Sequence, residues 1–452
     1  MEKLFEYILV SALSYITNIP ERRVYPDEKM LGSLDQFDEV LAQNGCDPIE
    51  TLHLLNEAGS SATVATTGGR YFGYVVGGSH PVSTAADWLV SVWDQVALLP
   101  STSPVVAKIE AVTARWLLDI FQLPKTSIVS FVTGTSMGNL VCLAAARNHI
   151  LTRLGWDVEA NGLFGAPSIR VIVGMEAHIT VVKALGLLGM GRQRVEVVPV
   201  DAQGRLSIDA LPSLDDRTII CLQAGNVNSG AFDPIAQVCA RAKDVGSWVH
   251  IDGAFGLWAA ASPDKVHLVK GLEQADSWVT DGHKWLNTPY DCGIAICRHN
   301  EPLQAAMTTT ASYIANSKEI PAKDIVPEFS RRARAVPLWA TMRSLGSNGI
   351  TDLIDRCCKY ALQFAEGLAN LGFTIHNDVF LNQVVASLDS PDKTMKFVGL
   401  LQEEGTCWLG LTLWQGHTAF RLSVSSWVTA EQDVDISLKT MAKILNEVKN
   451  TC

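Results

Sequence analysis

The chain has 452 residues and a mass of 49.0 kDa. At roughly 150 residues per domain, it has room for two or three domains with sizeable cores. Hydrophobic residues form 48% of the chain and charged residues 18%, which excludes a disordered protein. Asp and Glu outnumber Lys and Arg by 47 to 36, for a net charge of −11, so binding to nucleic acids or anionic membranes is not expected. The ten cysteines include no CxxC pair, which indicates reduced thiols in a cytoplasmic protein and no metal site.

Residues 1–19 predict an amphipathic helix. Their apolar side chains recur at helical spacing: Leu4, Phe5, Ile8, Leu9, Ala12, Leu13 and Ile16. Glu2 and Glu6 do not fit the basic start of a secretory signal. A further helix is expected near residues 34–42. The longest uncharged run, 126–146, contains a polar turn at 133–139, so it predicts a buried strand followed by a buried helix, and no membrane span.

Beyond residue 100, short apolar runs alternate with helical patterns. Strands are expected at 128–132, 170–173, 195–199, 218–222, 248–251, 277–280 and 293–297. Helices are expected at 104–121, with Ser103 as the cap, and at 137–151, 179–188 and 235–245. This alternation predicts a mainly parallel sheet that is covered on both faces. Ligands of such sheets bind at the carboxyl ends of the strands.

The last third of the chain predicts a smaller α/β domain. Helices are expected at 334–345, 352–371 and 431–448, and strands at 373–376, 383–387 and 419–424. Three segments follow from these patterns. Residues 1–70 form an N-terminal helical arm that contributes to dimerisation, 71–320 form the large domain, and 321–452 form the small C-terminal domain.

Lys284 follows the strand expected at 277–280 and lies between His283 and Trp285. Burial at such a place favours a neutral amine, which can form a Schiff base with an aldehyde. The alternative is a solvated lysine in a surface loop, which is more common for a lysine taken alone.

Asp252 ends the strand expected at 248–251. A carboxylate there can pair with a cationic ring nitrogen, as pyridoxal phosphate requires, because a protonated pyridine acts as an electron sink. The alternative for Asp252 is a helix cap or a turn residue.

The turn at 133–139 places hydroxyls and glycines between a strand and the start of a helix. Free N–H groups and the helix dipole suit a phosphate there, although a turn of this kind taken alone is more often structural. His178 follows the strand at 170–173. Its imidazole can lie flat on an aromatic cofactor, and the alternative is a core or capping histidine.

Taken together, these segments resemble the group II pyridoxal-phosphate-dependent amino-acid decarboxylases. That family includes the glutamate, histidine and aromatic L-amino-acid decarboxylases and plant aldehyde synthases. The order of the segments matches: a Gly/Thr/Ser turn, a histidine, His-x-Asp and His-Lys-Trp. The likeness runs from Arg70 through the segment at 330–334 to Arg421.

The resemblance implies an aspartate-aminotransferase-like fold (fold type I). In this α/β fold, the large domain carries a mainly parallel sheet and binds pyridoxal 5'-phosphate, and a smaller α/β domain follows. It also implies a homodimer with shared active sites that acts on a small amino-acid substrate.

By the same resemblance, Lys284 is the lysine of the internal aldimine. Asp252 pairs with the pyridine nitrogen, and His178 stacks on the ring. The other cofactor contacts that the resemblance implies are Thr135 and Ser136 in the phosphate turn, His283 at the phosphate, Ala254 under the ring, and Asn226 near the ring hydroxyl or the substrate. The substrate amine displaces Lys284 to form an external aldimine, the bond at Cα perpendicular to the ring breaks, and an amine leaves.

The resemblance further implies a substrate pocket that includes Tyr71, Phe72, His80 and the stretch around Trp93. The alternative for each of these residues is ordinary core packing. Arg421 either binds a carboxylate or forms a structural ion pair.

The sequence departs from the family at the mobile loop before residue 330. The family's decarboxylases place a tyrosine there, whereas this chain has Ile325, which cannot donate a proton, and the nearest other phenol is Tyr313. The change favours decarboxylation-coupled oxidative deamination (an aldehyde synthase), or carbon–carbon bond-forming or bond-cleaving chemistry, as the alternative to simple decarboxylation. A third hypothesis, an inactive homologue acting as a binding protein, is disfavoured because Lys284 and Asp252 are both present.

Overall fold

The computed structural model describes residues 1–309 and 320–450, so Tyr313 lies outside the described residues. The chain forms two compact units, each assembled from separate stretches. The large unit comprises Ser79–Lys359 and Asn377–Gln383, and the small unit comprises Met1–Gly78, Tyr360–His376 and Val384–Cys452. The first 78 residues therefore belong to the same unit as the C-terminal end. None of the helices in the described ranges is long and apolar enough to cross a membrane.

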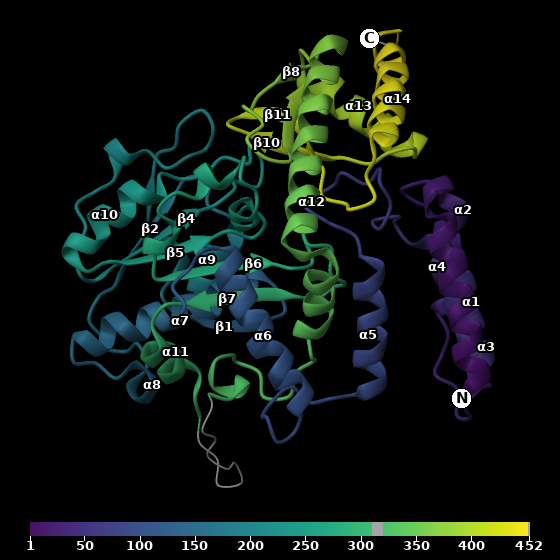
Figure 1. Ribbon diagram of the computed structural model, residues 1–452. Helices are drawn as coiled ribbons and strands as arrows, with labels where there is room; N and C mark the ends of the chain where they lie inside the picture. The colour runs from purple at the N-terminus through teal and green to yellow at the C-terminus, as the bar shows by residue number, and fades with distance from the viewer. Residues whose placement is uncertain (310–319, 451–452) are drawn as a thin grey trace. The chain divides into compact units, whose positions relative to one another are not determined.

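The large unit contains the main sheet and most of the helices (Figure 1). Its strands are β1 Ile128–Val132, β2 Arg170–Gly174, β3 Val195–Val198, β4 Thr218–Gln223, β5 Trp248–Asp252, β6 Ser277–Asp281 and β7 Gly293–Cys297. Its helices are α5 Pro81–Trp93, α6 Pro104–Ile120, α7 Thr135–Arg153, α8 Val158–Asn161, α9 Ile179–Leu187, α10 Ile235–Val245 and α11 Asn300–Met307. Helix α12, Ala335–Leu371, begins in the large unit and ends in the small one.

The seven strands pair in the order β1-β7-β6-β5-β4-β2-β3. Strand β7 runs antiparallel to both of its neighbours, and the pairs β6–β5, β5–β4, β4–β2 and β2–β3 are parallel. The six strands other than β7 therefore run the same way and end at one edge. Strands β4 to β7 are buried along their whole length, which explains their continuous apolar runs. The expected mainly parallel α/β sheet is confirmed.

Helix α7 packs across β7, β6 and β5. Its small residues Ala144 to Ala146 are almost fully buried, so the helix can approach the sheet closely. At its first turn, a side chain added to Gly138 would lie 2.8 Å from Val279 on β6. This close approach brings the start of α7 to the carboxyl end of β6.

The small unit combines an N-terminal group of helices with a second sheet. Its helices include α1 Glu2–Asn18, α2 Glu28–Gly32, α3 Pro48–Leu54, α4 Ser60–Ala62, α13 Pro391–Glu404 and α14 Glu431–Asn450. Its strands are β8 Thr374–Ile375, β9 Gln383–Ser387, β10 Gly410–Trp414 and β11 His417–Ser423, in the order β10-β11-β9-β8. Phe373, Phe397 and Phe420 form the aromatic centre of this unit, with ring centroids 4.9 to 5.5 Å apart.

Several expected elements differ from the structure. No helix covers residues 38–47, where Val40 and Leu41 are more than nine-tenths exposed and so have no core to bury against. Helix α6 begins after Ser103 as predicted, but the Ser103 hydroxyl makes no capping bond. The two helices expected at 334–345 and 352–371 form α12, which is interrupted at Gly346, where φ is 62°. Helix α5 and strand β10 were not predicted.

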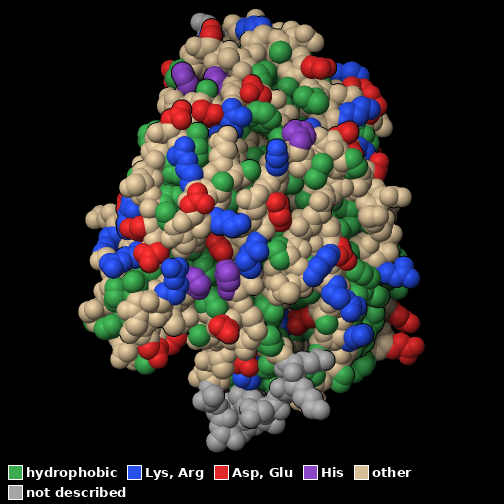
Figure 2. Space-filling model, turned by 60° about the vertical axis from the view of Figure 1, so that its left-hand side comes forward, with side chains coloured by type: hydrophobic (Ala, Val, Ile, Leu, Met, Phe, Trp, Pro, Cys, Tyr) green, Lys and Arg blue, Asp and Glu red, His purple; other side chains and the backbone are tan. Residues whose placement is uncertain are grey.

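The charged side chains are distributed as the composition suggests. On the face drawn in Figure 2, Lys and Arg side chains are interspersed with Asp and Glu. This mixture differs from the single basic surface that typically binds nucleic acid.

Gly293 on β7 lies directly against the turn that begins α7. A side chain added there would lie 2.3 Å from the Cα of Gly134, which is backbone and cannot rotate away. We expect Gly293→Ala to lower the free energy of unfolding by about 1–3 kcal/mol, measured by urea denaturation. The matched control is Gly399→Ala in α13, where an added methyl meets nothing within 4 Å and should stabilise the helix by up to about 1 kcal/mol. Equal effects of the two changes would contradict the prediction.

Candidate active site

The candidate site lies at the edge of the large sheet where the parallel strands end (Figure 1). Asp252 is the last residue of β5 and Asp281 the last residue of β6, and these strands are neighbours. The turn before α7 follows β1, and His178 follows β2. The topology thus gathers the four polar segments that the sequence singled out, as expected for ligand sites in sheets of this kind.

Lys284 is held at this edge by Asp281. The Lys284 Nζ atom lies 3.1 Å from Asp281 Oδ2. The Thr135 N–H donates to Asp281 Oδ1 at 2.8 Å, and its hydroxyl donates to Oδ2 at 3.0 Å. Asp281 is only 1% exposed, so these three donors compensate its burial. Sequence reasoning gave Asp281 no role, although its place three residues before the lysine was a usable signal.

His283 faces the same carboxylate. Its Nδ1 atom accepts the Cys292 N–H at 3.0 Å, and its Nε2 atom lies 3.7 Å from Asp281 Oδ2. Burial lowers the pKa of His283, and Asp281 acts in the opposite direction. Because Nδ1 accepts, the neutral ring carries its proton on Nε2, on the side of Asp281.

Asp252 is buried beside two donors. The Asn139 amide donates to Asp252 Oδ2 at 3.2 Å, and the Ala254 N–H donates to Oδ1 at 3.3 Å. The Ala254 carbonyl accepts the Asp281 N–H at 2.9 Å, so Ala254 links the two acidic residues through its backbone. Asn139 belongs to the turn noted in the sequence, but it was not assigned a role.

His178 is the N-cap of α9. Its Nδ1 atom lies 2.7 Å from the Thr180 hydroxyl and accepts the Thr180 N–H at 3.4 Å. The capping alternative is therefore realised in the structure. The capping contact uses only the Nδ1 edge of the His178 imidazole. The stacking of this imidazole on the cofactor remains a prediction.

The remaining cofactor candidates differ in whether their polar groups already have partners within the protein. Thr135 commits both of its donors to Asp281, whereas Ser136 is exposed in the first turn of α7. Asn226 closes its own turn, with Oδ1 accepting the N–H groups of Asn228 at 2.8 Å and Ser229 at 3.2 Å. In this arrangement Ser136 is better placed than Thr135 to meet a phosphate.

The substrate candidates lie in both units. In the small unit, Tyr71 stacks on Trp408 with centroids 5.2 Å apart, and Phe72 is fully buried with its ring edge on Phe364. Burial lowers the pKa of Arg421 to about 10. In the large unit, His80 donates its N–H to the Asn287 carbonyl at 2.7 Å, and burial lowers the pKa of its ring. Their roles toward a substrate remain predictions.

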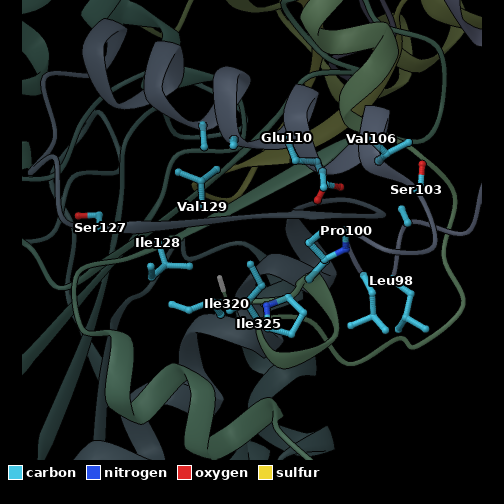
Figure 3. Close-up of a pocket in the computed structure, with 17 residues that line it drawn as sticks. Leu98, Pro100, Ser103, Val106, Glu110, Ser127, Ile128, Val129, Ile320 and Ile325 are labelled. Atoms are coloured by element: carbon cyan, nitrogen blue, oxygen red, sulfur yellow. The ribbon is translucent and has the colours of Figure 1, made fainter. Parts of the chain in front are cut away.

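Ile325 lines a separate cavity of about 220 Å³ in the large unit (Figure 3). Leu98, Pro100 and Glu110 line the same cavity, whereas Lys284 and Asp252 are not among its lining residues. The Ile325 side chain packs against the core that includes α7, and its carbonyl accepts the Ser130 hydroxyl at 2.9 Å. Its surroundings are those of a packing residue.

The residues at the sheet edge fit pyridoxal phosphate. Lys284 offers a primary amine, Asp252 a buried carboxylate for a ring nitrogen, and Ser136 a hydroxyl at the start of a 19-residue helix. Gly134 keeps the position beside His283 free of a side chain, which would lie only 3.3 Å from the imidazole. Within the described ranges, no group of side chains is arranged to hold a metal ion.

Comparison with known families agrees with this fit. Residues 45–388 match the model of the pyridoxal-dependent decarboxylase conserved domain. The chain belongs to the pyridoxal-dependent decarboxylase family. Its expected cofactor, pyridoxal 5'-phosphate, and its expected standing as an amino-acid decarboxylase-like enzyme are thereby confirmed.

Individual relatives of this decarboxylase-family enzyme span most of its length. An aromatic-L-amino-acid decarboxylase of Bacillus atrophaeus is 27% identical over 434 residues, covering 90% of this chain and 88% of the relative. A phenylacetaldehyde synthase of a Rosa hybrid cultivar is 26% identical over 325 residues, covering 67% and 62%. The crystal structure of Oryza sativa TDC with PLP and tryptamine matches with a TM-score of 0.90 at 21% identity, covering 99% of this chain and 97% of that one. The expected fold is confirmed.

Proposed function

We propose that this enzyme removes the α-carboxylate of an aromatic L-amino acid and releases the corresponding amine. The observation that carries the proposal is the placement of Lys284 against Asp281, with Asp252 ending the neighbouring strand. The aromatic class is supported by the Bacillus atrophaeus relative, whose name specifies aromatic L-amino acids.

Bound pyridoxal phosphate supplies an aldehyde for the lysine amine and a ring that takes up the electron pair left at Cα. In this proposal Lys284 provides the amine, and Asp281 orients it. Asp252 holds a proton at the ring nitrogen, and His178 flanks the ring. Ser136 and His283 face the phosphate. The contact of Lys284 with Asp281 and the burial of Asp252 beside the Asn139 amide support the roles proposed for these residues.

Aldehyde release is the second candidate function. Ile325, at the position expected for the loop tyrosine, cannot protonate Cα, and a phenylacetaldehyde synthase is among the relatives. In this candidate function, oxygen reacts at Cα instead of a proton.

Product identification separates the two candidates. The purified, cofactor-loaded enzyme is offered a panel of L-amino acids in air, and the products are identified by mass spectrometry. We expect an amine from phenylalanine, tyrosine or tryptophan, and none from glutamate or alanine. An aldehyde with ammonia and peroxide would favour the second candidate. An amine from glutamate alone would contradict the aromatic assignment.

We also propose a homodimer with shared active sites. Helix α1 has no buried residue, and Phe5, Leu9, Val10, Leu13 and Ile16 are each about half exposed or more. A contiguous apolar face of this kind typically marks a protein interface. We expect the mass from light scattering to be twice 49.0 kDa, and Leu13→Asp to shift it toward the monomer. The control is Glu6→Gln at an exposed position of the same helix, which should leave the mass unchanged.

A cytoplasmic location completes the proposal. All nine cysteines in the described ranges are free thiols, which fits a reducing compartment. Fractionation of the source cells with antibody detection tests this location.

A further inference from the structure

A chain of buried hydrogen bonds leads from the interior of the sheet to Asp252. The Trp248 indole N–H donates to the Ser277 hydroxyl at 3.0 Å, and that hydroxyl lies 2.9 Å from His250 Nδ1. His250 Nε2 lies 2.8 Å from Asn139 Oδ1, and the Asn139 amide donates to Asp252 at 3.2 Å. Ser277, His250 and Asn139 are fully buried, and Trp248 is 2% exposed.

The carboxylate end of this chain fixes the direction of every proton in it. Asp252 as a carboxylate can only accept, so the Asn139 amide N–H groups face it and the Asn139 carbonyl oxygen faces His250 Nε2. The proton of the neutral His250 ring therefore lies on Nε2, and Nδ1 accepts the Ser277 hydroxyl proton. The Ser277 oxygen is then left to accept the Trp248 indole N–H, which can only donate. The assignment is consistent at every link.

Asn139 is also a branch point. Its amide donates to the Thr180 hydroxyl at 3.3 Å, and that hydroxyl lies 2.7 Å from His178 Nδ1. The two amide protons of one side chain therefore serve Asp252 and, through Thr180, His178. These are the two residues expected at the ring nitrogen and at the ring face of the cofactor.

We propose that His250 and Asn139 are positioning residues that lock the orientation of Asp252 and His178 toward the cofactor ring. The proposal rests on the proposed roles of those two residues. If the Asn139 amide turned over, its carbonyl oxygen would face the Asp252 carboxylate, and acceptor would meet acceptor. His250 prevents this turn because its Nε2 proton requires the carbonyl oxygen. Burial lowers the pKa of His250 to about 3, so the ring stays neutral, and the lock keeps its direction, near neutral pH.

Two substitutions of His250 separate a lock from mere core packing. Gln at 250 carries an amide N–H at the reach of Nε2, so it can still donate to Asn139. Asn at 250 reaches only as far as Nδ1 and loses that donation. Both remove the ring, so a packing role predicts similar losses for the two variants. The control is His376→Asn, which removes a half-buried histidine bonded to the Ser387 hydroxyl in the small unit.

The readouts are the dissociation constant for pyridoxal phosphate and the pH dependence of the absorbance band of the lysine-bound cofactor. We expect His250→Asn to weaken cofactor binding roughly tenfold to a hundredfold. This variant loses the N–H donor that keeps the Asn139 amide directed at Asp252. Its absorbance band should also change with pH where the wild-type band is constant. His250→Gln should retain binding within about threefold of the wild type, and His376→Asn should match the wild type.

Nitrogen-15 NMR of the histidine-labelled holoenzyme tests the direction of the chain without any variant. We expect His250 to remain in the Nε2–H form between about pH 5 and pH 9. An Nδ1–H form would overturn the inference, as would equal cofactor affinities and band profiles in His250→Asn and His250→Gln. A wild-type protein that forms no lysine-bound band would instead refute the proposed function, which keeps the two failures distinct.

Discussion

Lys284→Ala is expected to lower turnover by about a thousandfold or more and to abolish the absorbance band of the lysine-bound cofactor. The amine is the group that reacts with the cofactor aldehyde, and alanine offers none. The fold should survive, because Asp281 keeps both donors from Thr135 after the lysine is removed. Turnover, the absorbance spectrum and the thermal midpoint are measured on the same preparation.

Two further variants make the Lys284 result specific. Lys284→Arg keeps a cation beside Asp281 but replaces the nucleophilic amine with a guanidinium, which stays protonated, so it should be as inactive as Lys284→Ala. Lys270→Ala removes an exposed lysine of the same unit and should leave both the turnover and the band unchanged. Substantial turnover in Lys284→Arg would show that the reaction does not depend on the lysine amine.

Arg331→Met is expected to lower the free energy of unfolding by about 3–5 kcal/mol. Arg331 Nη2 lies 2.7 Å from both carboxylate oxygens of Glu110, and its Nη1 donates to the Phe131 carbonyl at 3.3 Å. The two side chains are 2% and 15% exposed. Removing the arginine leaves a buried carboxylate without its counter-charge, which is more costly than losing the attraction alone.

Neighbouring residues supply the controls for Arg331. Arg332→Met breaks a pair of the same length with Asp87, at 2.7 Å, but those side chains are 41% and 28% exposed, so the loss should stay below about 1 kcal/mol. The double variant Arg331→Met with Glu110→Leu should regain most of the lost stability, because no buried charge remains. Equal losses for Arg331→Met and Arg332→Met in urea denaturation would refute the argument.

The Arg331→Met variant should also change its response to pH. Burial raises the pKa of Glu110 above its usual value of 4.5, and Arg331 opposes this rise without cancelling it. Without Arg331, the folded-state pKa of Glu110 rises further above that value. The folded variant then binds a proton more readily than the unfolded chain. Its stability deficit relative to the wild type should therefore be largest near neutral pH and shrink as the pH falls toward 4.5.

The central sheet was well predicted because its strands are buried on both faces. The strand expected at 128–132 is β1, and the one expected at 293–297 is β7, with the same bounds. The antiparallel course of β7 was not predicted, since a buried apolar run has the same pattern in either direction. Strand β10 was missed because only one of its five residues is buried, which leaves little hydrophobic signal.

The sequence predicted those site residues whose type and position at the end of a strand indicate their chemistry. Lys284, His283 and Asp252 lie at strand ends that the sequence pattern locates, and the structure gathers them at one edge of the sheet. The partners Asp281, Asn139 and His250 lie within or beside the motifs of the sequence, but their roles were not recognised. Their importance depends on contacts across more than 100 residues of sequence, as between Asn139 and His250, and periodicity cannot show such contacts.

The order of the two units along the chain has a consequence for synthesis on the ribosome. The first 78 residues emerge early, but the rest of their unit begins only at Tyr360. At about 5–20 residues per second, residues 79–359 take roughly 15 to 60 s to be made. During that delay nearly the whole large unit becomes available to fold. The apolar face of α1 stays exposed to solvent throughout this time. Because α1 has no buried residue even in the folded chain, we expect nascent chains of this enzyme to bind chaperones through this helix until the proposed dimerisation covers its apolar face.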